Sequence, residues 1–172
     1  MKKPTALLAA FSCAALMSLG AASVAHADTP ANGSGNTIKN LNSGLCAAVG
    51  DNSKSNGAGL IQYKCDTKAN KQFTSTWAGT DSYFFKVTSS GKCIQPQGTA
   101  EHALVVQQTC SNSDLQVWTA VFLGNDSYQL RNRASGLCLG AGWGATNSGQ
   151  PLDQAVCGAF PGQSWRFTAQ SG

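Results

Sequence analysis

A short motif recurs three times in this chain, as Gly44-Leu45-Cys46, Gly91-Lys92-Cys93 and Gly136-Leu137-Cys138, with its cysteines 47 and 45 residues apart. A second cysteine follows each copy after 17 or 19 residues. These second cysteines, which are 45 and 47 residues apart, are Cys65, Cys110 and Cys157. A fixed period of this length is the signature of a fold built from repeated units. We therefore expect three copies of one structural unit.

Apolar residues and a glutamine keep the same phase as the cysteines. The recurring apolar positions are Ile38, Phe85 and Leu130; Leu60, Val105 and Leu152; and Phe73, Trp118 and Trp165. The glutamines, three residues before each second cysteine, are Gln62, Gln107 and Gln154. The segments between turn residues are short and β-like, as at 83–87 and 103–106. We predict an all-β fold with about four strands per repeat, apolar layers around a threefold axis, and a closed sheet without exposed edges.

The six phased cysteines predict one disulfide within each repeat. The period pairs Cys46 with Cys65, Cys93 with Cys110, and Cys138 with Cys157. An even number of cysteines in a small domain is typical of an oxidising, extracellular compartment. Each bridge restricts the unfolded chain and is worth about 3 kcal/mol. Because one repeat cannot bury its own apolar face, stability should require all three repeats.

Residues 1–27 have the pattern of a secretory signal peptide. Two lysines come first, an uncharged stretch follows, and Ala25-His26-Ala27 offers a small-residue cleavage site. We predict cleavage before Asp28 and a secreted protein, which removes the seventh cysteine, Cys13. The alternatives are an uncleaved membrane anchor and a lipoprotein attached through Cys13. The second half of the stretch is rich in Ala, Gly and Ser rather than Leu, which disfavours the anchor.

The rest of the chain has little net charge. Charged residues make up 12% of the sequence, and from Asp28 onward ten basic residues face eight acidic ones. This surplus is too small to attract nucleic acid or an anionic membrane surface, so we expect neither as a partner. No apolar run after Asp28 is long enough to span a membrane. Residues 28–36 are expected to form a flexible N-terminal segment because Gly, Asn, Ser and Pro dominate them.

The repeats resemble the ricin B-type lectin family of β-trefoil domains, in the form found in secreted bacterial proteins. The family carries Gln-x-Trp near the end of each repeat, and here it stands as Gln116-Val117-Trp118 and Gln163-Ser164-Trp165. The first repeat departs from this motif, with Lys71-Gln72-Phe73 in register. The resemblance implies a β-trefoil domain over 37–172, with repeats at 37–79, 80–124 and 125–169. It also implies that the motif tryptophans belong to the core rather than to a binding site.

The resemblance implies where a sugar would bind. Family members that bind galactose-like sugars carry an aspartate two residues after the first cysteine, an aromatic residue two before the second, and an asparagine three before the motif Trp. The aspartate is absent from all three repeats, where the residues are Ala48, Gln95 and Gly140. The aromatic residue survives as Tyr63, with Gln108 and Ala155 in the other repeats. The asparagine survives as Asn70, with Leu115 and Gly162 in the others.

Repeat one is therefore the expected carbohydrate-binding repeat. Tyr63 would stack on the apolar face of a sugar, and Asn70 would bind its hydroxyls. Asp51, three positions after Ala48, is a candidate for the missing carboxylate, and it could equally be a solvated turn residue. Lys71 stands where the motif glutamine is expected. Repeat two could form a polar pocket from Gln95 and Gln108 but lacks a stacking ring.

Repeat three has an aromatic residue of its own, Trp143. It lies in the loop Gly140-Ala141-Gly142-Trp143-Gly144. A tryptophan flanked by glycines is either an exposed stacking platform or a side chain folded over the barrel wall, and the sequence leaves both open.

The sequence offers little for catalysis. After Asp28 it contains one histidine, His102, and one glutamate, Glu101, and it has no Gly-x-Ser-x-Gly, His-Glu-x-x-His or Cys-x-x-Cys motif. His102 precedes a strand and is expected to be a surface turn residue. We expect no catalytic residues, no metal site and no cofactor.

The expected function is that of a secreted, non-catalytic carbohydrate-binding module. It would bind galactose-like or other glycans weakly, mainly through the first repeat, with a glycan or polysaccharide as partner. The alternative is a β-trefoil that binds a protein, such as a secreted protease inhibitor, with degenerate sugar sites. A third possibility is the binding subunit of a toxin or an enzyme.

Overall fold

The structure is a computed structural model that describes residue 30 and residues 35–169. The predicted signal peptide at 1–27 lies outside these residues, as does most of the segment predicted to be flexible at 28–36. Within the described residues, the strands in chain order are β1 (Gly35–Asn40), β2 (Cys46–Val49), β3 (Leu60–Tyr63), β4 (Phe73–Gly79), β5 (Ser82–Val87), β6 (Cys93–Pro96), β7 (Val105–Gln108), β8 (Val117–Gly124), β9 (Ser127–Asn132), β10 (Cys138–Ala141), β11 (Leu152–Ala155) and β12 (Trp165–Ala169). The short 3₁₀ helices are η1 (Gly50–Asn52), η2 (Ala69–Lys71), η3 (Asp114–Gln116) and η4 (Gly142–Gly144).

Six of the strands form a closed antiparallel barrel. The pairs run β1–β4, β4–β5, β5–β8, β8–β9, β9–β12 and β12–β1, so the last strand returns to the first. Strand β1 begins at Gly35, where Gly35 pairs with Thr74 and Asn36 with Phe73. This corrects the N-terminal segment predicted for 28–36 at its last two residues, because their backbone belongs to the barrel ladder. Ring closure leaves no barrel edge unpaired, as expected for a stable all-β fold.

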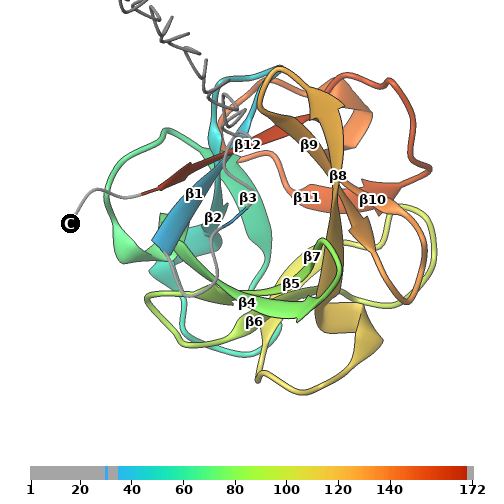
Figure 1. The fold of residues 1–172 in the computed structure, drawn as a ribbon. Helices are drawn as coiled ribbons and strands as arrows, with labels where there is room; N and C mark the ends of the chain where they lie inside the picture. Colours follow the sequence, from blue (N-terminus) through green and yellow to red (C-terminus); the bar gives the residue numbers. More distant parts are fainter. Residues whose placement is uncertain (1–29, 31–34, 170–172) are drawn as a thin grey trace, which may run out of the picture.

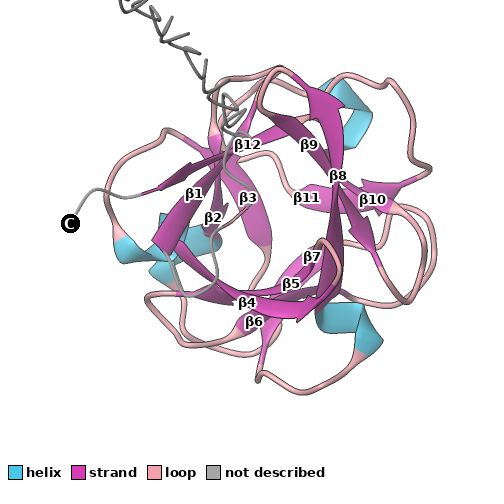
Figure 2. Ribbon diagram, in the orientation of Figure 1, coloured by secondary structure: helices cyan, strands magenta, loops and turns pink. Residues whose placement is uncertain are grey.

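The other six strands form three hairpins on the barrel. Each repeat contributes one, namely β2–β3, β6–β7 and β10–β11. Bridges between neighbouring hairpins, such as Gly59 with Val106 and Leu104 with Asp153, bring the three together. In Figure 1 the colours of the three repeats follow one another around the centre of the molecule, and Figure 2 shows the short helices at its outer edge. This is the predicted β-trefoil, with four strands in each repeat.

The three disulfides lie within the repeats, as the period predicted. They join Cys46 to Cys65, Cys93 to Cys110, and Cys138 to Cys157. In each case a strand that begins a hairpin is tied to the segment that leaves it. The bridges therefore close each hairpin covalently.

The core consists of the phased apolar residues. All nine are at most 1% exposed: Ile38, Leu60, Phe73, Phe85, Val105, Trp118, Leu130, Leu152 and Trp165. The two motif tryptophans are anchored as well as buried, since Trp118 donates its indole N–H to Ile94 O at 3.1 Å and Trp165 donates to Leu139 O at 3.0 Å. The core role expected for these tryptophans is confirmed.

The three phased glutamines connect the repeats to one another. Gln62 Nε2 donates to Ala145 O and Asn147 O in the β10–β11 loop of repeat three. Gln107 Nε2 donates in the same way to Ser53 O and Ser55 O of repeat one. Gln154 completes the circle by donating to Gly98 O and Ala100 O of repeat two. Each amide oxygen accepts a hydrogen bond from a serine of its own repeat, Ser43, Ser90 or Ser135.

The helical turns are each three residues long, so none in the described part of the chain could cross a bilayer.

Substitution of a connecting glutamine should destabilise the whole fold. Gln107→Ala removes three hydrogen bonds of a fully buried side chain. We expect a loss of about 3 kcal/mol in the free energy of unfolding, because three hydrogen bonds and the packing of a fully buried side chain are lost together. Urea denaturation followed by tryptophan fluorescence measures this loss, with the exposed Gln97→Ala as the control. A loss below about 1 kcal/mol would show that the glutamine circle does not hold the repeats together.

Candidate carbohydrate-binding site

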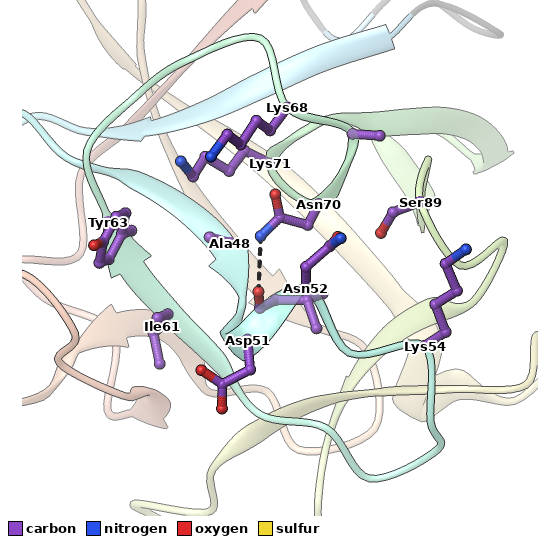
Figure 3. Close-up of a pocket in the computed structure, with 12 residues that line it drawn as sticks. Ala48, Asp51, Asn52, Lys54, Ile61, Tyr63, Lys68, Asn70, Lys71 and Ser89 are labelled. Atoms are coloured by element: carbon purple, nitrogen blue, oxygen red, sulfur yellow. Dashed lines mark hydrogen bonds between the residues drawn. The ribbon is translucent and has the colours of Figure 1, made fainter.

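Four of the five predicted carbohydrate-binding residues line one cleft of repeat one. This cleft has a volume of about 700 Å³. Strands β2 and β3 form its floor, and the two helical turns η1 and η2 form its sides (Figure 3). Tyr63, Asn70, Asp51 and Lys71 all line it. Residues from two strands and two helical turns of one repeat therefore meet at one surface.

Strand register places Tyr63 over the cleft. Tyr63 pairs with Cys46, and Ile61 pairs with Ala48. Because successive side chains alternate between the two faces of a strand, Tyr63, Ile61 and Ala48 share the outer face while Gln62 points into the molecule. The Tyr63 side chain is 47% exposed, so its ring is accessible to a ligand.

Asp51 reaches the cleft through an unusual backbone conformation. In η1, Asp51 has φ 52° and Asn52 has φ 51°, a left-handed geometry that Asp and Asn adopt more readily than most residues. The turn places Asp51 at the edge of the cleft, beside Ile61 in Figure 3. The structure thus brings Asp51 to the cleft but does not put it at the position of the missing family carboxylate, where Ala48 is buried.

Asn70 lies on the opposite side of the cleft from Asp51 and keeps its amide oxygen available to a ligand. Its Nδ2 donates to Val49 O at 2.9 Å, and this bond fixes the orientation of the amide (Figure 3). No hydrogen bond among the described residues ends on its Oδ1. Nearby, the buried Ser89 Oγ lines the same cleft and has no hydrogen-bond partner among the described residues. The Asn70 oxygen can accept a hydrogen bond from a ligand hydroxyl.

Lys71 is held by an ion pair rather than free to act as a mobile cation. Its Nζ lies 2.6 Å from Asp66 Oδ2 and 5.0 Å from the centre of the Tyr63 ring. The hydrogen bond from Lys71, followed by the backbone N–H of Lys68, lowers the pKa of Asp66 below its usual 3.8. Lys71 is 3% exposed, so it packs against the tyrosine ring instead of projecting into solvent.

Repeat two lacks the same arrangement. Gln95, at the aspartate position, accepts a hydrogen bond from Gln116 Nε2 at 2.8 Å. Gln116 also binds Thr109 O and the Ser111 N–H. The motif glutamine and Gln95 therefore bind each other, and the ring that repeat one has in Tyr63 is replaced by Gln108.

Repeat three presents Trp143 at the surface, which settles the two alternatives for this side chain. Trp143 is 91% exposed and lies at the edge of a second cleft of about 530 Å³. It has the same position in η4 as Asp51 in η1 and nearly the same backbone, with φ 57°. A left-handed conformation costs a residue with a Cβ about 1–2 kcal/mol. The asparagine position is Gly162, where a Cβ would lie 2.8 Å from Ala141 O, so no side chain fits there.

Two residues of this second cleft come from positions that the family pattern does not mark. His102 stacks on Trp143 with ring centres 5.1 Å apart, and its Nδ1 lies 3.1 Å from Asp153 Oδ2. His102 is indeed in a surface turn, but its contacts with repeat three were not foreseen. The sequence did mark Asp153 as unusual. It stands four residues before the second cysteine of its repeat, where the other two repeats have the apolar residues Ile61 and Val106.

In repeat one, sequence reasoning missed the polar residues that reach the cleft from other segments. These are Asn52, Lys54, Lys68 and Ser89. Of these, Ser89 comes from the β5–β6 turn of the next repeat, at a position that the family pattern does not mark.

The closed barrel and the three bridged hairpins define a β-trefoil protein. The family described as Ricin-type beta-trefoil lectin domain-like matches residues 24–108, 75–155 and 114–172. The three matches together span well over half of the sequence, so the chain belongs to this family. No curated protein matches the chain.

Solved structures share the fold. ThreeFoil, a designed 3-fold symmetric protein, is 29% identical, with a TM-score of 0.76 over 78% of this chain and 97% of its own. A ricin B-like lectin from Macrolepiota procera, solved in complex with lactose, is 19% identical, with a TM-score of 0.70 over 81% of this chain and 97% of its own. An exo-beta-1,3-galactanase from Clostridium thermocellum is 19% identical, with a TM-score of 0.77 over 80% of this chain but only 30% of its own. At 19% identity the latter two show the fold alone.

The Asp66–Lys71 pair should contribute to stability in a pH-dependent way. Because the folded-state pKa of Asp66 is lowered, its contribution is present above the unfolded pKa and is lost as the pH falls through the folded value. Asp66→Asn should reduce stability by about 1 kcal/mol at neutral pH, a small value because the carboxylate is exposed and screened. Urea denaturation at a series of pH values measures this difference.

The matched control is Asp81→Asn, in an exposed turn of another hairpin. A stability difference for Asp66→Asn that stays constant down to the acid limit would contradict the role of the ion pair.

Proposed function

We propose that this protein is a secreted, non-catalytic carbohydrate-binding module that binds glycans mainly through the cleft of repeat one. One observation carries the proposal: the exposed Tyr63 ring lies across a cleft from the fixed Asn70 amide, whose oxygen has no partner among the described residues. A pyranose needs this combination, because one face of its ring is apolar and its hydroxyls need partners to replace water.

The preference is for galactose-like sugars at modest affinity. Tyr63 and Asn70 occupy the positions that bind such sugars in the resembling family, and they support this preference. Ala48 replaces the carboxylate, and a hydrogen bond to a charged group is worth about 1.5–3 kcal/mol. Its loss corresponds to about one to two powers of ten in affinity. Asp51 supplies a carboxylate at the edge of the cleft, where it can restore part of this loss.

Secretion and the lack of catalysis complete the proposal. The pattern of residues 1–27 and the three disulfides support export to an oxidising compartment. Membership of a lectin-type family supports binding without catalysis. With one main cleft per chain, useful avidity would come from clustered glycans or from several chains.

Truncation of Tyr63 should abolish glycan binding without unfolding the protein. Tyr63→Ala removes the stacking surface from an exposed position, so the melting temperature should change by no more than a degree or so. A glycan array, followed by titration with lactose, measures the binding. Trp77→Ala removes another exposed aromatic ring outside the cleft and serves as the control.

Full lactose binding by the Tyr63→Ala variant would contradict binding through repeat one. If the unmodified protein bound no glycan and inhibited a protease in a panel, the protein-binding alternative would replace the proposal.

A further inference from the structure

The cleft of repeat three contains a nearly buried carboxylate with a free oxygen. Asp153 is 7% exposed and lies on β11 directly opposite Gly140 of β10. Because Gly140 has no side chain, nothing from β10 covers the carboxylate. A Cβ at Gly140 would lie 3.6 Å from Asp153 Oδ1. This oxygen therefore lies next to the space that a side chain at position 140 would occupy.

The two oxygens of Asp153 have different surroundings. Oδ2 accepts from His102 Nδ1 at 3.1 Å. No hydrogen-bond donor or cation among the described residues reaches Oδ1. A carboxylate removed from water is stabilised by a partner that donates hydrogen bonds, and most strongly by one that carries positive charge. Oδ1 is therefore the polar anchor that this cleft offers to a ligand.

Aromatic rings form the edge of the same cleft. Trp143 is 91% exposed, and Phe160 is 57% exposed. His102 stacks on Trp143 with the ring planes 22° apart, which fixes the orientation of the indole. A cation close to an indole face is attracted to it, and the C–H face of a pyranose packs on the same surface.

The charges that line the two clefts are opposite in sign. Repeat three has the carboxylates of Glu101 and Asp153, and His102 is the only basic residue in the lining. The cleft of repeat one has Lys54 and Lys68, besides the Lys71 that is paired with Asp66, against the single carboxylate of Asp51. The repeat-three cleft therefore favours a ligand with positive charge, whereas the repeat-one cleft does not.

We propose that the repeat-three cleft is a second binding site, specific for saccharides that carry a free primary ammonium group. The ammonium donates to Asp153 Oδ1, and the apolar face of the amino sugar packs on Trp143. His102 is a positioning residue that holds both the indole and the carboxylate. This site extends the proposed function, but it depends on none of the residues that form the repeat-one cleft.

A disaccharide of glucosamine and its N-acetylated counterpart test the proposal, because acetylation removes the charge and keeps the sugar rings. The test uses the Trp77→Phe background, in which Trp143 is the exposed indole and Trp118 and Trp165 are buried. Titration near neutral pH should change the Trp143 emission, with the amine form binding about tenfold more tightly than the acetylated form. Added salt should reduce this preference.

Two variants assign the preference to the proposed groups. Asp153→Asn keeps the shape of the side chain and the contact with His102, and it should abolish the preference for the amine form. Trp143→Ala, measured by calorimetry, should weaken both forms. The control Asp81→Asn, the same change in an exposed turn, should leave binding unchanged. Lactose binding that depends on Tyr63 should survive Asp153→Asn and Trp143→Ala, so the two sites can fail separately.

Three results would overturn the proposal. They are equal or tighter binding of the acetylated disaccharide, a preference for the amine that persists in Asp153→Asn, and equal binding of butylammonium, which has the charge without the sugar ring.

Discussion

The structure depends on the circle of hydrogen bonds made by Gln62, Gln107 and Gln154. Each amide crosses from its own repeat to two backbone carbonyls in the hairpin loop of another repeat. Loop carbonyls inside a protein need donors, and a buried glutamine can supply two from one nitrogen. Each repeat therefore satisfies the polar backbone of its neighbour, and none can do so alone.

This arrangement separates the scaffold from the binding surface. In each hairpin strand, the residues that point inward follow the threefold pattern, whereas those that point outward are free to differ. Gln62 and Gln154 are equivalent inward-facing residues, but their outward neighbours Tyr63 and Ala155 share no chemistry. The same backbone can thus present a basic cleft with a tyrosine in repeat one and an acidic cleft with a tryptophan in repeat three.

Much of the repeat-one cleft could be predicted because its residues lie at fixed offsets from a cysteine or from the motif aromatic. Tyr63, Asn70, Asp51 and Lys71 all line one cleft. Ser89 could not be placed there, since it arrives from the next repeat through a turn. Asp153 was overlooked for a different reason: the family pattern puts the carboxylate on the first hairpin strand, and here a carboxylate comes from the second strand, opposite Gly140.

The sequence by itself determined the threefold β fold, the disulfide pairing, the core layers and the candidate residues of repeat one. It could do so because the residues that form each structural contact recur three times in the sequence. The period alone therefore identifies the residues that pack together or form a disulfide. Only the tertiary structure decided that Trp143 is exposed, that His102 of repeat two stacks on it, and that Asp153 keeps a free oxygen. These contacts occur once and join different repeats, so they depend on how the loops approach one another in space and leave no period in the chain.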